Sequence, residues 1–354
     1  MSAPEGRPEI RLGIVGLGLA ARMVLDSLVD DPRIAVVAGA DPAEPSRAEF
    51  ARRTGAAAYP DVAELLDAPG VDAVWVASPT RFHRAHVEAA AAAGKDVIVE
   101  KPMAPTVDDC AAMVTAADKA GVLLVAGGVR SLDPAFAAMR DVIGSGALGT
   151  LRHLSATAHT GWLLRDRAPA DLDESLGGGI VFNQAPHQVD TVRLLAGGAA
   201  VRSVLATTAT WSERRPVVGQ FRAELDFDGG LTAVLCYDGH GYLRSTDLVR
   251  VEGPASSVLA DAGLVVASGS RGAVRPHGDH LQLVTDDGAQ DIPISPGDAT
   301  TGAVAELLAA RRPGAGPPRH CGEWGRATLE VVAAIGESAR TRTRVLLAEK
   351  GLHT

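Results

Sequence analysis

The sequence predicts a protein of two domains, a doubly wound α/β domain followed by an α+β domain with an open, mainly antiparallel sheet. Its 354 residues leave room for two domains of ordinary size. Short buried strands alternate with helices as far as Ala126, which is typical of a parallel sheet. After Gly149 longer strands follow one another, joined by turn signals such as Asp228-Gly229-Gly230. We therefore place domains at residues 1–126 and 127–323, and a C-terminal helix and tail at 324–354 that we expect to pack back on the first domain.

Composition excludes several classes of partner. Apolar residues make up 46% and charged residues 22%, which is the composition of a globular protein. The net charge of −9, without any basic run, argues against nucleic acid and against anionic membrane. Aromatic residues at 4% argue against a stacking platform for single-stranded nucleic acid, and the apolar runs are too short to span a bilayer. The cysteines have no paired spacing and the first residues do not form a signal peptide, so we expect a cytoplasmic protein with a small-molecule ligand.

A glycine-rich turn follows the first predicted strand, Ile10–Val15. The segment GLGLAA begins at Gly16 and leads into a helix that continues to Leu28, which is the G-x-G-x-x-A form of the dinucleotide fingerprint of Rossmann domains. Gly16 allows the tight turn, and Gly18 allows the backbone to approach a diphosphate at the helix N-terminus. We expect four residues of this turn to contact the cofactor: Gly16, Gly18, Leu19 and Ala20.

Asp41 ends the second predicted strand, Ile34–Ala40. A carboxylate at this position can accept hydrogen bonds from the 2′-hydroxyl of a ribose and repel a 2′-phosphate. No arginine follows Asp41 directly, and Arg47 is six residues further on. We therefore expect NAD as the cofactor, with NADP as the alternative. The competing interpretation of Asp41 is a helix N-cap before Pro42.

Ser78 and Pro79 follow the buried strand predicted at residues 71–77, where they would border the cofactor. A helix that ends near Ala93 comes next, and we include His83 at its start among the cofactor-binding residues. His83 and His86 are three residues apart and could share a metal ion. With no further cluster of cysteine, histidine or acid nearby, we expect capping or surface histidines and no metal.

The stretch DVIVEKP, residues 96–102, is the one around which we organise the site. Val97, Ile98 and Val99 form a short buried strand that presents Glu100, Lys101 and Pro102 at its carboxyl end, where ligands gather in open α/β sheets. A lysine on a rigid element is well placed to act on a bound substrate. By itself the charged pair would more often be a solvated loop. A cis peptide before Pro102 would aim Lys101 sharply.

The remaining elements follow from periodicity, capping and turn signals. We expect helices at residues 46–54, 61–66, 107–120, 134–143 and 324–339, strands at 56–59, 122–126, 151–159, 201–211, 220–227, 231–237 and 247–251, edge hairpins within 253–291, and a loop at 312–318.

A further helix, predicted at Ile180–Leu195, carries an unusual polar stripe. Asn183 and His187 are four residues apart and share a face, with Asp190 one turn further along. An amide, an imidazole and an acid are costly to bury without a polar task, so this stripe is a candidate site. The alternative is a stripe that simply faces solvent.

Taken together, these motifs resemble the Gfo/Idh/MocA oxidoreductase family. GLGLAA, Asp41, SPTRFH, VEKP and GGGIVFNQAPHQVD stand in the family's order and spacing over almost the whole chain. The resemblance implies a Rossmann domain, an open-sheet domain that binds substrate and forms oligomers, and hydride transfer between nicotinamide and a hydroxyl or keto carbon of a sugar, cyclitol or related polyol. It also implies a catalytic role for Lys101 and for the pair Asn183 and His187.

Two positions depart from the family pattern. Asn183 replaces the usual aspartate, and because an amide cannot take a proton, it can orient substrate but cannot act as a general base. Gly128 stands where the family often has histidine, whereas Arg130 matches a position that is commonly basic and is expected to contact substrate.

A narrower resemblance, to the phthalate dihydrodiol dehydrogenase-like branch, covers residues 162–198 and 320–340, although Cys321 replaces a usual aspartate. It implies an alternative substrate, a carboxylated cyclic cis-dihydrodiol that is oxidised to a catechol. Arg165 and Arg167 could clamp the carboxylate, or could simply solvate a loop. Trp162, Gln184 and His187 complete the expected substrate contacts.

The resemblance leads to a mechanistic expectation in which substrate lies between the domains. Lysine has an ordinary pKa of about 10.4, too high for a base at neutral pH, and burial beside a positive nicotinamide should lower it. We favour His187 as base and Lys101 as the group that polarises the hydroxyl, with Lys101 as base the alternative. Two other functions remain open, a non-catalytic NAD-binding sensor and a redox-assisted elimination or glycoside cleavage that regenerates NAD. We expect a homodimer or homotetramer built through the open sheet face.

Overall fold

The structure is a computed structural model that describes residues 8–28, 30–164, 166, 169–173, 178–211, 213, 217–242, 244–245 and 263–347. The chain forms two compact units. Unit 1 comprises residues 1–128 and 298–329, and unit 2 comprises residues 129–297 and 330–354.

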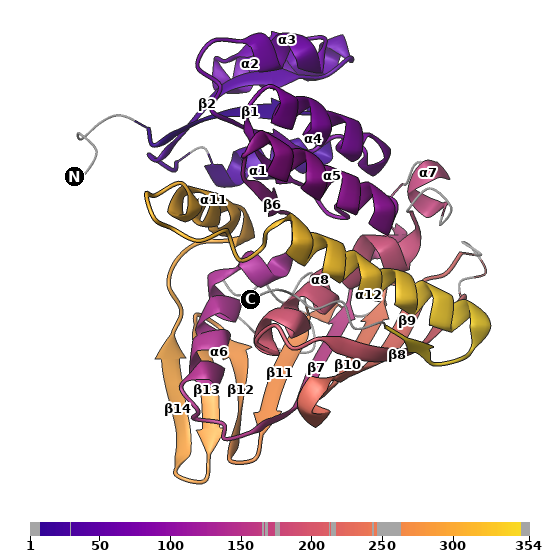
Figure 1. The fold of residues 1–354 in the computed structure, drawn as a ribbon. Helices are drawn as coiled ribbons and strands as arrows, with labels where there is room; N and C mark the ends of the chain where they lie inside the picture. Colours follow the sequence, from indigo (N-terminus) through magenta and orange to yellow (C-terminus); the bar gives the residue numbers. More distant parts are fainter. Residues whose placement is uncertain are drawn as a thin grey trace. The chain divides into compact units, whose positions relative to one another are not determined.

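Unit 1, whose strands β1, β2 and β6 are labelled in Figure 1, contains a parallel six-stranded sheet. The order of its strands is β3-β2-β1-β4-β5-β6. The strands are β1 (Ile10–Val15), β2 (Ile34–Ala40), β3 (Ala57–Tyr59), β4 (Ala73–Val76), β5 (Asp96–Val99) and β6 (Leu124–Ala126). All residues of β4 are buried, and Val97, Ile98 and Val99 of β5 are fully buried, as their apolar runs predict. The order of strands reverses between β1 and β4, so ligands are expected at the carboxyl ends of these strands.

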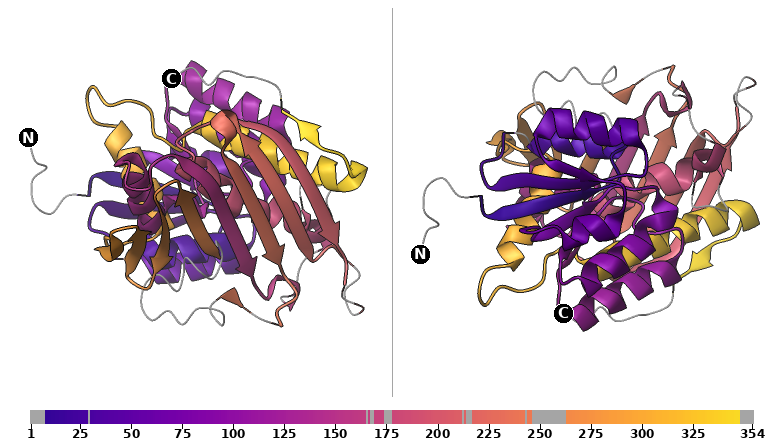
Figure 2. Two further views of the ribbon diagram at one scale, coloured as in Figure 1. Left: turned by 90° about the horizontal axis from the view of Figure 1, so that it is seen from below. Right: turned by 90° about the horizontal axis from the view of Figure 1, so that it is seen from above.

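Helices cover both faces of this sheet (Figure 2). They are α1 (Leu19–Leu28), α2 (Glu44–Thr54), α3 (Val62–Asp67), α4 (His83–Ala92), which follows the short η1 (Thr80–Phe82), α5 (Val107–Ala120) and α11 (Ala299–Ala310). The caps are those expected from the sequence. Asp61 accepts from the N–H of Ala63 at the start of α3, and Thr106 accepts from the N–H of Asp109 at the start of α5. The doubly wound α/β class is therefore confirmed.

Helix α11 was not predicted, and it changes the boundary of the units. Asp298 forms a capping box with Thr301, and Val304 and Leu307 are buried. The helix packs against β5 and β6. The backbone of Cys321, further along the chain, forms an isolated antiparallel β-bridge with Val125 of β6. Residues 298–323, which we placed in the second domain, therefore belong to unit 1. The apolar residues of this segment predict burial, but they do not specify which sheet buries them.

Unit 2 contains a nine-stranded sheet with the order β14-β13-β12-β11-β7-β10-β9-β8-β15 (Figure 2). The strands are β7 (Leu151–His159), β8 (Val201–Ala209), β9 (Gln220–Phe227), β10 (Thr232–Asp238), β11 (Leu264–Gly269), β12 (Gly272–His277), β13 (His280–Thr285), β14 (Gly288–Pro293) and β15 (Val345–Leu346). The β7–β10 pair is parallel and the others are antiparallel, which confirms the mainly antiparallel class. The strand expected at residues 247–251 lies outside the described residues.

The helices described in unit 2 are η2 (Arg130–Leu132), α6 (Pro134–Gly144), η3 (Trp162–Leu164), α7 (Pro169–Leu172) and α8 (Gly179–Leu195), with the short η5 (Asp228–Gly230) between β9 and β10. Helix α8 packs on β7, β9 and β10. Helix α12 (Gly322–Thr341) begins in unit 1 and ends in unit 2. Its Ser338 accepts from the N–H of Ala206, and Val345 then pairs with Val204 of β8. The tail that we expected on the first domain thus extends the sheet of unit 2.

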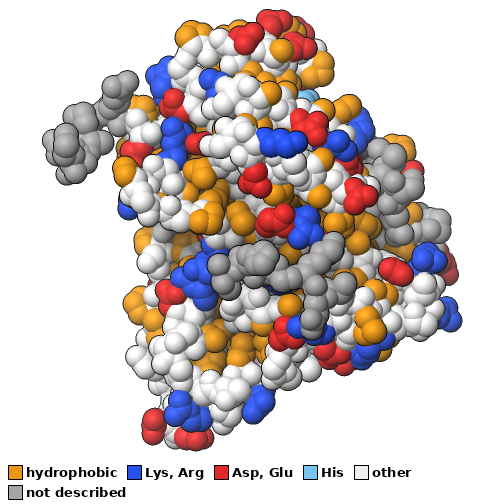
Figure 3. Space-filling model, viewed as in Figure 1, with side chains coloured by type: hydrophobic (Ala, Val, Ile, Leu, Met, Phe, Trp, Pro, Cys, Tyr) orange, Lys and Arg blue, Asp and Glu red, His pale blue; other side chains and the backbone are white. Residues whose placement is uncertain are grey.

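Acidic and basic side chains are interspersed over the face shown in Figure 3. Over the part of the chain that the structure describes, no helix combines the length and the apolar character that crossing a membrane requires.

Candidate active site

The carboxyl edge of the sheet in unit 1 brings together most of the predicted cofactor residues. The loops after β1, β2, β4 and β5 carry Gly16, Asp41, Ser78 and Lys101 respectively, and these strands are neighbours and parallel. Their carboxyl ends therefore meet at one edge, as expected for a ligand site in an open α/β sheet.

The absence of a side chain has a different structural reason at each of the two glycines in the loop after β1. Gly16 has a φ of +83°, and a Cβ there would lie 2.6 Å from the N and Cα atoms of Ser78. Gly16 is thus required by the protein itself, because its loop packs directly on the loop after β4. A Cβ at Gly18 would meet nothing within 4 Å. The open space beside Gly18 is what a ligand that approaches the backbone would need.

The N-terminus of α1 has the chemistry of a diphosphate site. The O atom of Gly18 accepts the first helical bond from the N–H of Arg22, at 3.2 Å. The first turn carries no acidic residue, and Leu19 is 69% exposed. The first N–H groups of a helix have no partner within the helix, and the helix dipole favours an anion there. The residues present therefore fit the diphosphate of a dinucleotide.

Asp41 is held in a fixed orientation beside this loop. Its Oδ2 accepts from the N–H of Leu17 at 2.9 Å, and its Oδ1 accepts from the N–H of Ala43 at 2.8 Å. Each carboxylate oxygen has a second lone pair with which it can accept from a ribose hydroxyl. Ala43, not Asp41, is the N-cap residue of α2, so the capping interpretation of Asp41 is wrong. Nη1 of Arg47 donates to the O atoms of Asp41 and Pro42, both at 2.8 Å.

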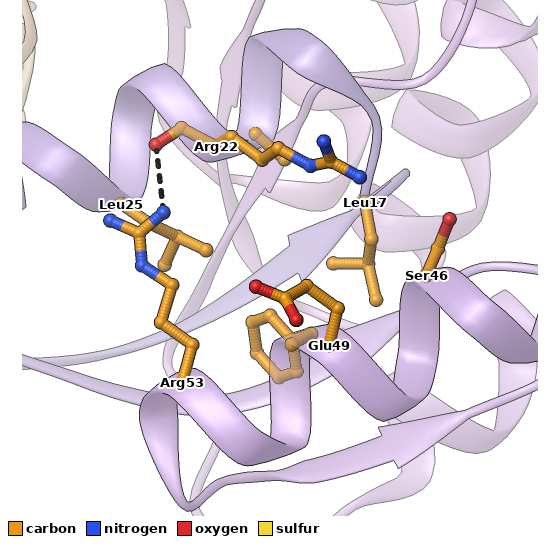
Figure 4. A pocket seen from close by; sticks show the side chains of 8 residues that line it. Leu17, Arg22, Leu25, Ser46, Glu49 and Arg53 are labelled. Atoms are coloured by element: carbon orange, nitrogen blue, oxygen red, sulfur yellow. Dashed lines mark hydrogen bonds between the residues drawn. The ribbon is translucent and has the colours of Figure 1, made fainter.

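A small pocket lies between α1 and α2 (Figure 4). Its lining residues are Leu17, Ala21, Arg22, Leu25, Ser46, Glu49, Phe50 and Arg53. Arg53 pairs with Asp26 and donates to the O atom of Arg22, and Arg22 points toward the end of the pocket formed by Leu17 and Ser46. Because Glu49 also lines it, the pocket presents both signs of charge and lacks the uniformly basic character of a phosphate site.

The loop after β5 fixes Glu100 and places Lys101 beside it. Oε1 of Glu100 accepts from Nε1 of Trp75 at 3.1 Å. Gly128 has a φ of +70°, and a Cβ there would lie 2.0 Å from Oε2 of Glu100. The space next to the backbone of Gly128 is thus filled by the Glu100 carboxylate. Lys101 is half-buried, and its peptide bond to Pro102 is cis, as predicted.

His83 lies beneath this edge. Its side chain is buried, with Nε2 2.7 Å from the O atom of Ser78 and Nδ1 3.1 Å from the O atom of Met103. Burial lowers the pKa of His83, and the hydrogen bonds to the carbonyl groups oppose this effect. Nδ1 of His86 lies 2.9 Å from Oγ of Ser78, and burial also lowers the pKa of His86. Within the described ranges, no group of three or more metal-binding side chains is placed to hold an ion.

In unit 2 the predicted substrate residues Trp162, Asn183 and Gln184 lie together. Oδ1 of Asn183 accepts from Nε1 of Trp162 at 3.1 Å and from Nε2 of Gln184 at 2.6 Å. These two donors set the orientation of the amide. Asn183 can therefore take part in hydrogen bonds but cannot carry a proton.

The polar stripe of α8 is buried, so the solvent-facing alternative is wrong. His187 is 5% exposed and Asp190 is 1% exposed. Oδ2 of Asp190 accepts from Oγ of Ser131, and Nε2 of Gln188 donates to the O atoms of Ala156 and Cys236. The bonds of Gln188 fix the helix on β7 and β10, and the bond of Asp190 fixes it on η2, which together orient His187.

The structure describes one of the three arginines that are predicted to contact substrate. Arg130 begins η2 and is half-buried in unit 2. Arg165 and Arg167 lie outside the described residues.

Asp238 and His240 form a pair that was not predicted from the sequence. Nδ1 of His240 lies 2.7 Å from Oδ1 of Asp238, and the ring stacks on Trp211. A Cβ at Gly219 would contact both Nε2 of His240 and Leu163, so the ring lies near the segment of Trp162. Among the described residues Nε2 of His240 has no hydrogen-bond partner although it is buried. The only signal in the sequence is an acid and a histidine two residues apart directly after a predicted strand, in the segment DGHG.

Comparison with family models gives two matches. Residues 10–127 match a model described as an oxidoreductase family with an NAD-binding Rossmann fold. Residues 136–257 match the model of the C-terminal domain of Gfo/Idh/MocA proteins.

Individual relatives extend the match over most of the chain. A 1-carboxy-3-chloro-3,4-dihydroxycyclohexa-1,5-diene dehydrogenase from Comamonas testosteroni is 31% identical over 94% of this chain and 95% of its own. A 1,5-anhydro-D-fructose reductase from Ensifer adhaerens is 29% identical over 80% of this chain and 83% of its own. The crystal structure of a putative dehydrogenase from Bordetella bronchiseptica RB50 is similar with a TM-score of 0.89 and 30% identity, covering 96% of this chain and 100% of that one.

Proposed function

Because the chain belongs to the Gfo/Idh/MocA family of NAD-binding oxidoreductases, we propose that it oxidises a ring-bound hydroxyl of a carboxylated cyclic cis-dihydrodiol. The family assignment makes it an NAD(P)-dependent dehydrogenase or reductase that acts on CH–OH groups. The observation that carries the proposal is Asn183. A neutral amide, held by Trp162 and Gln184, replaces the anionic carboxylate expected at this position, and so it does not repel a substrate that is itself an anion.

The similarity to the dehydrogenase from Comamonas testosteroni supports this substrate class, because the name of that protein specifies a ring carboxylate and two hydroxyl groups. Arg165 and Arg167 are the proposed partners of the carboxylate, and Arg130 is the proposed further basic contact. In the neutral form of His240 the Nδ1 atom, which faces the Asp238 carboxylate, carries the proton, and the buried Nε2 atom is then an acceptor. It is a candidate to accept from the second hydroxyl of a vicinal diol.

In the proposed reaction bound NAD supplies the hydride acceptor. The residues proposed to hold it are Gly16, Gly18, Leu19 and Ala20 at the diphosphate, Asp41 at the ribose, and Ser78, Pro79 and Glu100 near the nicotinamide end. The Lys101 ammonium donates a hydrogen bond to the reacting hydroxyl and stabilises negative charge on its oxygen. His187 takes the hydroxyl proton, and Lys101 is the alternative base. Asn183 orients the substrate.

A second candidate substrate is a sugar or cyclitol. The observation that favours it is the similarity to the reductase from Ensifer adhaerens and to a myo-inositol 2-dehydrogenase from Thermotoga maritima, which is 32% identical over 53% of this chain. A neutral polyol would not need the arginine pair. The two candidates therefore differ in whether a substrate carboxylate matters.

The test is to incubate the purified protein and NAD with each member of a panel of candidate substrates, and to measure the rate of NADH formation by its absorbance. The panel contains cyclohexadiene cis-diols with and without a ring carboxylate, myo-inositol and a set of aldoses. The proposal requires that the carboxylated diol has the highest kcat/KM. A higher kcat/KM for a neutral polyol would overturn the substrate class, and NAD binding without turnover of any member would favour the sensor. Product without accumulated NADH would favour redox-assisted elimination.

We also propose a cytoplasmic homodimer or homotetramer that associates through the outer face of the sheet in unit 2. Leu205 of β8 and Val234 of β10, which are both in register with Glu224 of β9, are 36% and 43% exposed, so apolar side chains are available for an interface. Light scattering of the purified protein measures the subunit count, and a monomer at micromolar concentration would contradict the proposal.

A further inference from the structure

His83 is a buried polar residue that the proposed reaction does not use. It is the first residue of α4, and its side chain is 1% exposed. Each of its ring nitrogens faces a backbone carbonyl group, Nε2 that of Ser78 at 2.7 Å and Nδ1 that of Met103 at 3.1 Å. The ring cannot touch a bound cofactor in this arrangement, because it has almost no exposed surface.

The two carbonyl groups belong to the loops that follow neighbouring strands. Ser78 follows β4, and its backbone packs against Gly16 of the glycine-rich turn. Met103 follows β5 and lies two residues after Lys101. The imidazole of His83 therefore connects the loop at the cofactor turn to the loop that carries the lysine.

The connection is selective for a histidine side chain. A neutral imidazole has one N–H group, so it donates to one carbonyl, and only the protonated ring could donate to both. Met103 and Ala104 are buried, so water has little access to replace these bonds. Loss of the ring would leave the carbonyl that accepts its N–H as a buried unsatisfied acceptor, and would also remove the contact of the ring with the other loop. The loops would then be free to move relative to each other.

We propose that His83 is a positioning residue, which holds the loop of Lys101 against the loop of Ser78 and thereby fixes the location of the Lys101 ammonium. This inference rests on the proposed function only in taking Lys101 as the lysine that acts on substrate. The shorter contact, to Ser78, carries the N–H group of the neutral ring. Hydride transfer depends steeply on geometry, and a displacement of about 1 Å at a reacting group lowers the rate by about 100-fold.

The first test needs no substrate. The lysines of the chain are Lys95, Lys101, Lys119 and Lys350. Reductive methylation with ¹³C-formaldehyde therefore gives a sparse NMR spectrum, in which Lys101→Met identifies the signal of Lys101. We expect His83→Asn to change the chemical shift and the titration midpoint of Lys101. Lys95 is an internal control, because it precedes β5, donates to the O atom of Val71 and should be unaffected.

The matched control variant is His320→Asn. His320 is also 1% exposed and lies in unit 1, but its Nδ1 contacts Oε1 of Glu306 at 2.8 Å, far along the chain from both loops. It should leave the Lys101 signal unchanged. An unchanged Lys101 signal in folded His83→Asn, or an equal change in His320→Asn, would overturn the proposal. If His83→Asn does not fold, His83→Phe takes its place, since its ring fills a similar space but can donate to neither carbonyl.

The second test uses turnover of the best substrate of the panel. We expect His83→Asn to lower kcat about 10- to 100-fold while the Kd of NAD stays within about threefold. In a Lys101→Ala background the same substitution should have little further effect, because its consequence passes through Lys101. The same loss in both backgrounds would overturn the positioning role. If no substrate is turned over, the proposed function fails, and the NMR test still decides the role of His83.

Discussion

Replacement of the two glycines of the cofactor turn by alanine should separate stability from binding. Gly16 and Gly18 are two residues apart in one loop, yet a Cβ at Gly16 would lie 2.6 Å from backbone atoms of Ser78, whereas a Cβ at Gly18 would meet nothing within 4 Å. The loop of Ser78 cannot move aside easily, because the carbonyl of Ser78 is bonded to His83. Gly16→Ala should therefore destabilise the protein, and Gly18→Ala should not.

The magnitude follows from two terms at Gly16. Its φ of +83° lies in the left-handed region, where a side chain costs about 1–2 kcal/mol. Forcing a methyl group against packed backbone adds about 1–3 kcal/mol, for a total of about 2–5 kcal/mol. In a unit of this size each 1 kcal/mol corresponds to about 2–4 °C, so Gly16→Ala should lower Tm by at least about 4 °C. Gly18→Ala should change Tm by less than about 2 °C.

The assay combines thermal unfolding with calorimetric titration of NAD. Gly18→Ala should keep its fold and bind NAD at least about tenfold more weakly, because its methyl group would occupy the space in which the diphosphate approaches the backbone. Hydrogen exchange of β1 and β4 localises the loss of stability in Gly16→Ala. If Gly18→Ala loses as much Tm as Gly16→Ala, or binds NAD as tightly as the wild type, the different roles assigned to the two glycines are wrong.

Four further predictions concern single side chains. Lys101→Ala should lower kcat by at least about 100-fold with the Kd of NAD within about threefold, and a variant that retains a tenth of the wild-type kcat would refute the assignment. Asp41→Ser should reduce the preference for NAD over NADP, measured as a ratio of Kd values, by about tenfold or more; an unchanged ratio would show that Asp41 does not contact the ribose. Asn183→Asp should lower kcat/KM for a carboxylated diol relative to a neutral polyol, because it adds a negative charge, and an unchanged ratio would count against an anionic substrate. Burial raises the pKa of Glu306, but the hydrogen bond and charge of His320 outweigh it and hold that pKa below its ordinary value of 4.5. The ionised carboxylate of Glu306 therefore contributes fully to the free energy of unfolding above pH 4.5, and this contribution is lost as the pH falls through the lower pKa of the folded state. Glu306→Gln should thus make the free energy of unfolding, measured by denaturant titration at a series of pH values, fall less steeply below pH 4.5 than in the wild type.

The elements that the sequence predicted well depend on local patterns. Val97, Ile98 and Val99 form a continuous apolar run with charged residues after it, and such a run specifies a buried strand without knowledge of its partners. The turn at Gly16 has the same property, because its motif sets the backbone of the turn itself. The caps at Asp61 and Thr106 likewise need only the residues two or three positions further on.

The elements that the sequence missed depend on partners far away in the chain. Helix α11 has apolar residues on much of its surface, so its pattern does not indicate that β5 and β6 bury it. Strand β15 has two residues, and only its pairing with β8 defines it. The contacts of His83 with Ser78 and Met103 could not be predicted either, since they become visible only when the loops after β4 and β5 are placed side by side.

The two departures from the family pattern have separate structural explanations, and this bears on whether the protein is a catalyst or a sensor. Gly128 leaves no room for a side chain while Glu100 stays where Trp75 holds it, so its small size follows from packing at the carboxyl edge. Oδ1 of Asn183 accepts hydrogen bonds from Trp162 and Gln184, and the carboxylate of an aspartate at that position could accept the same two hydrogen bonds. The change from carboxylate to amide therefore removes a charge and a proton acceptor but keeps the local arrangement. Since the proposed base is His187 or Lys101, the proposal implies that the loss of a carboxylate at position 183 alters which substrates are tolerated more directly than it abolishes proton transfer.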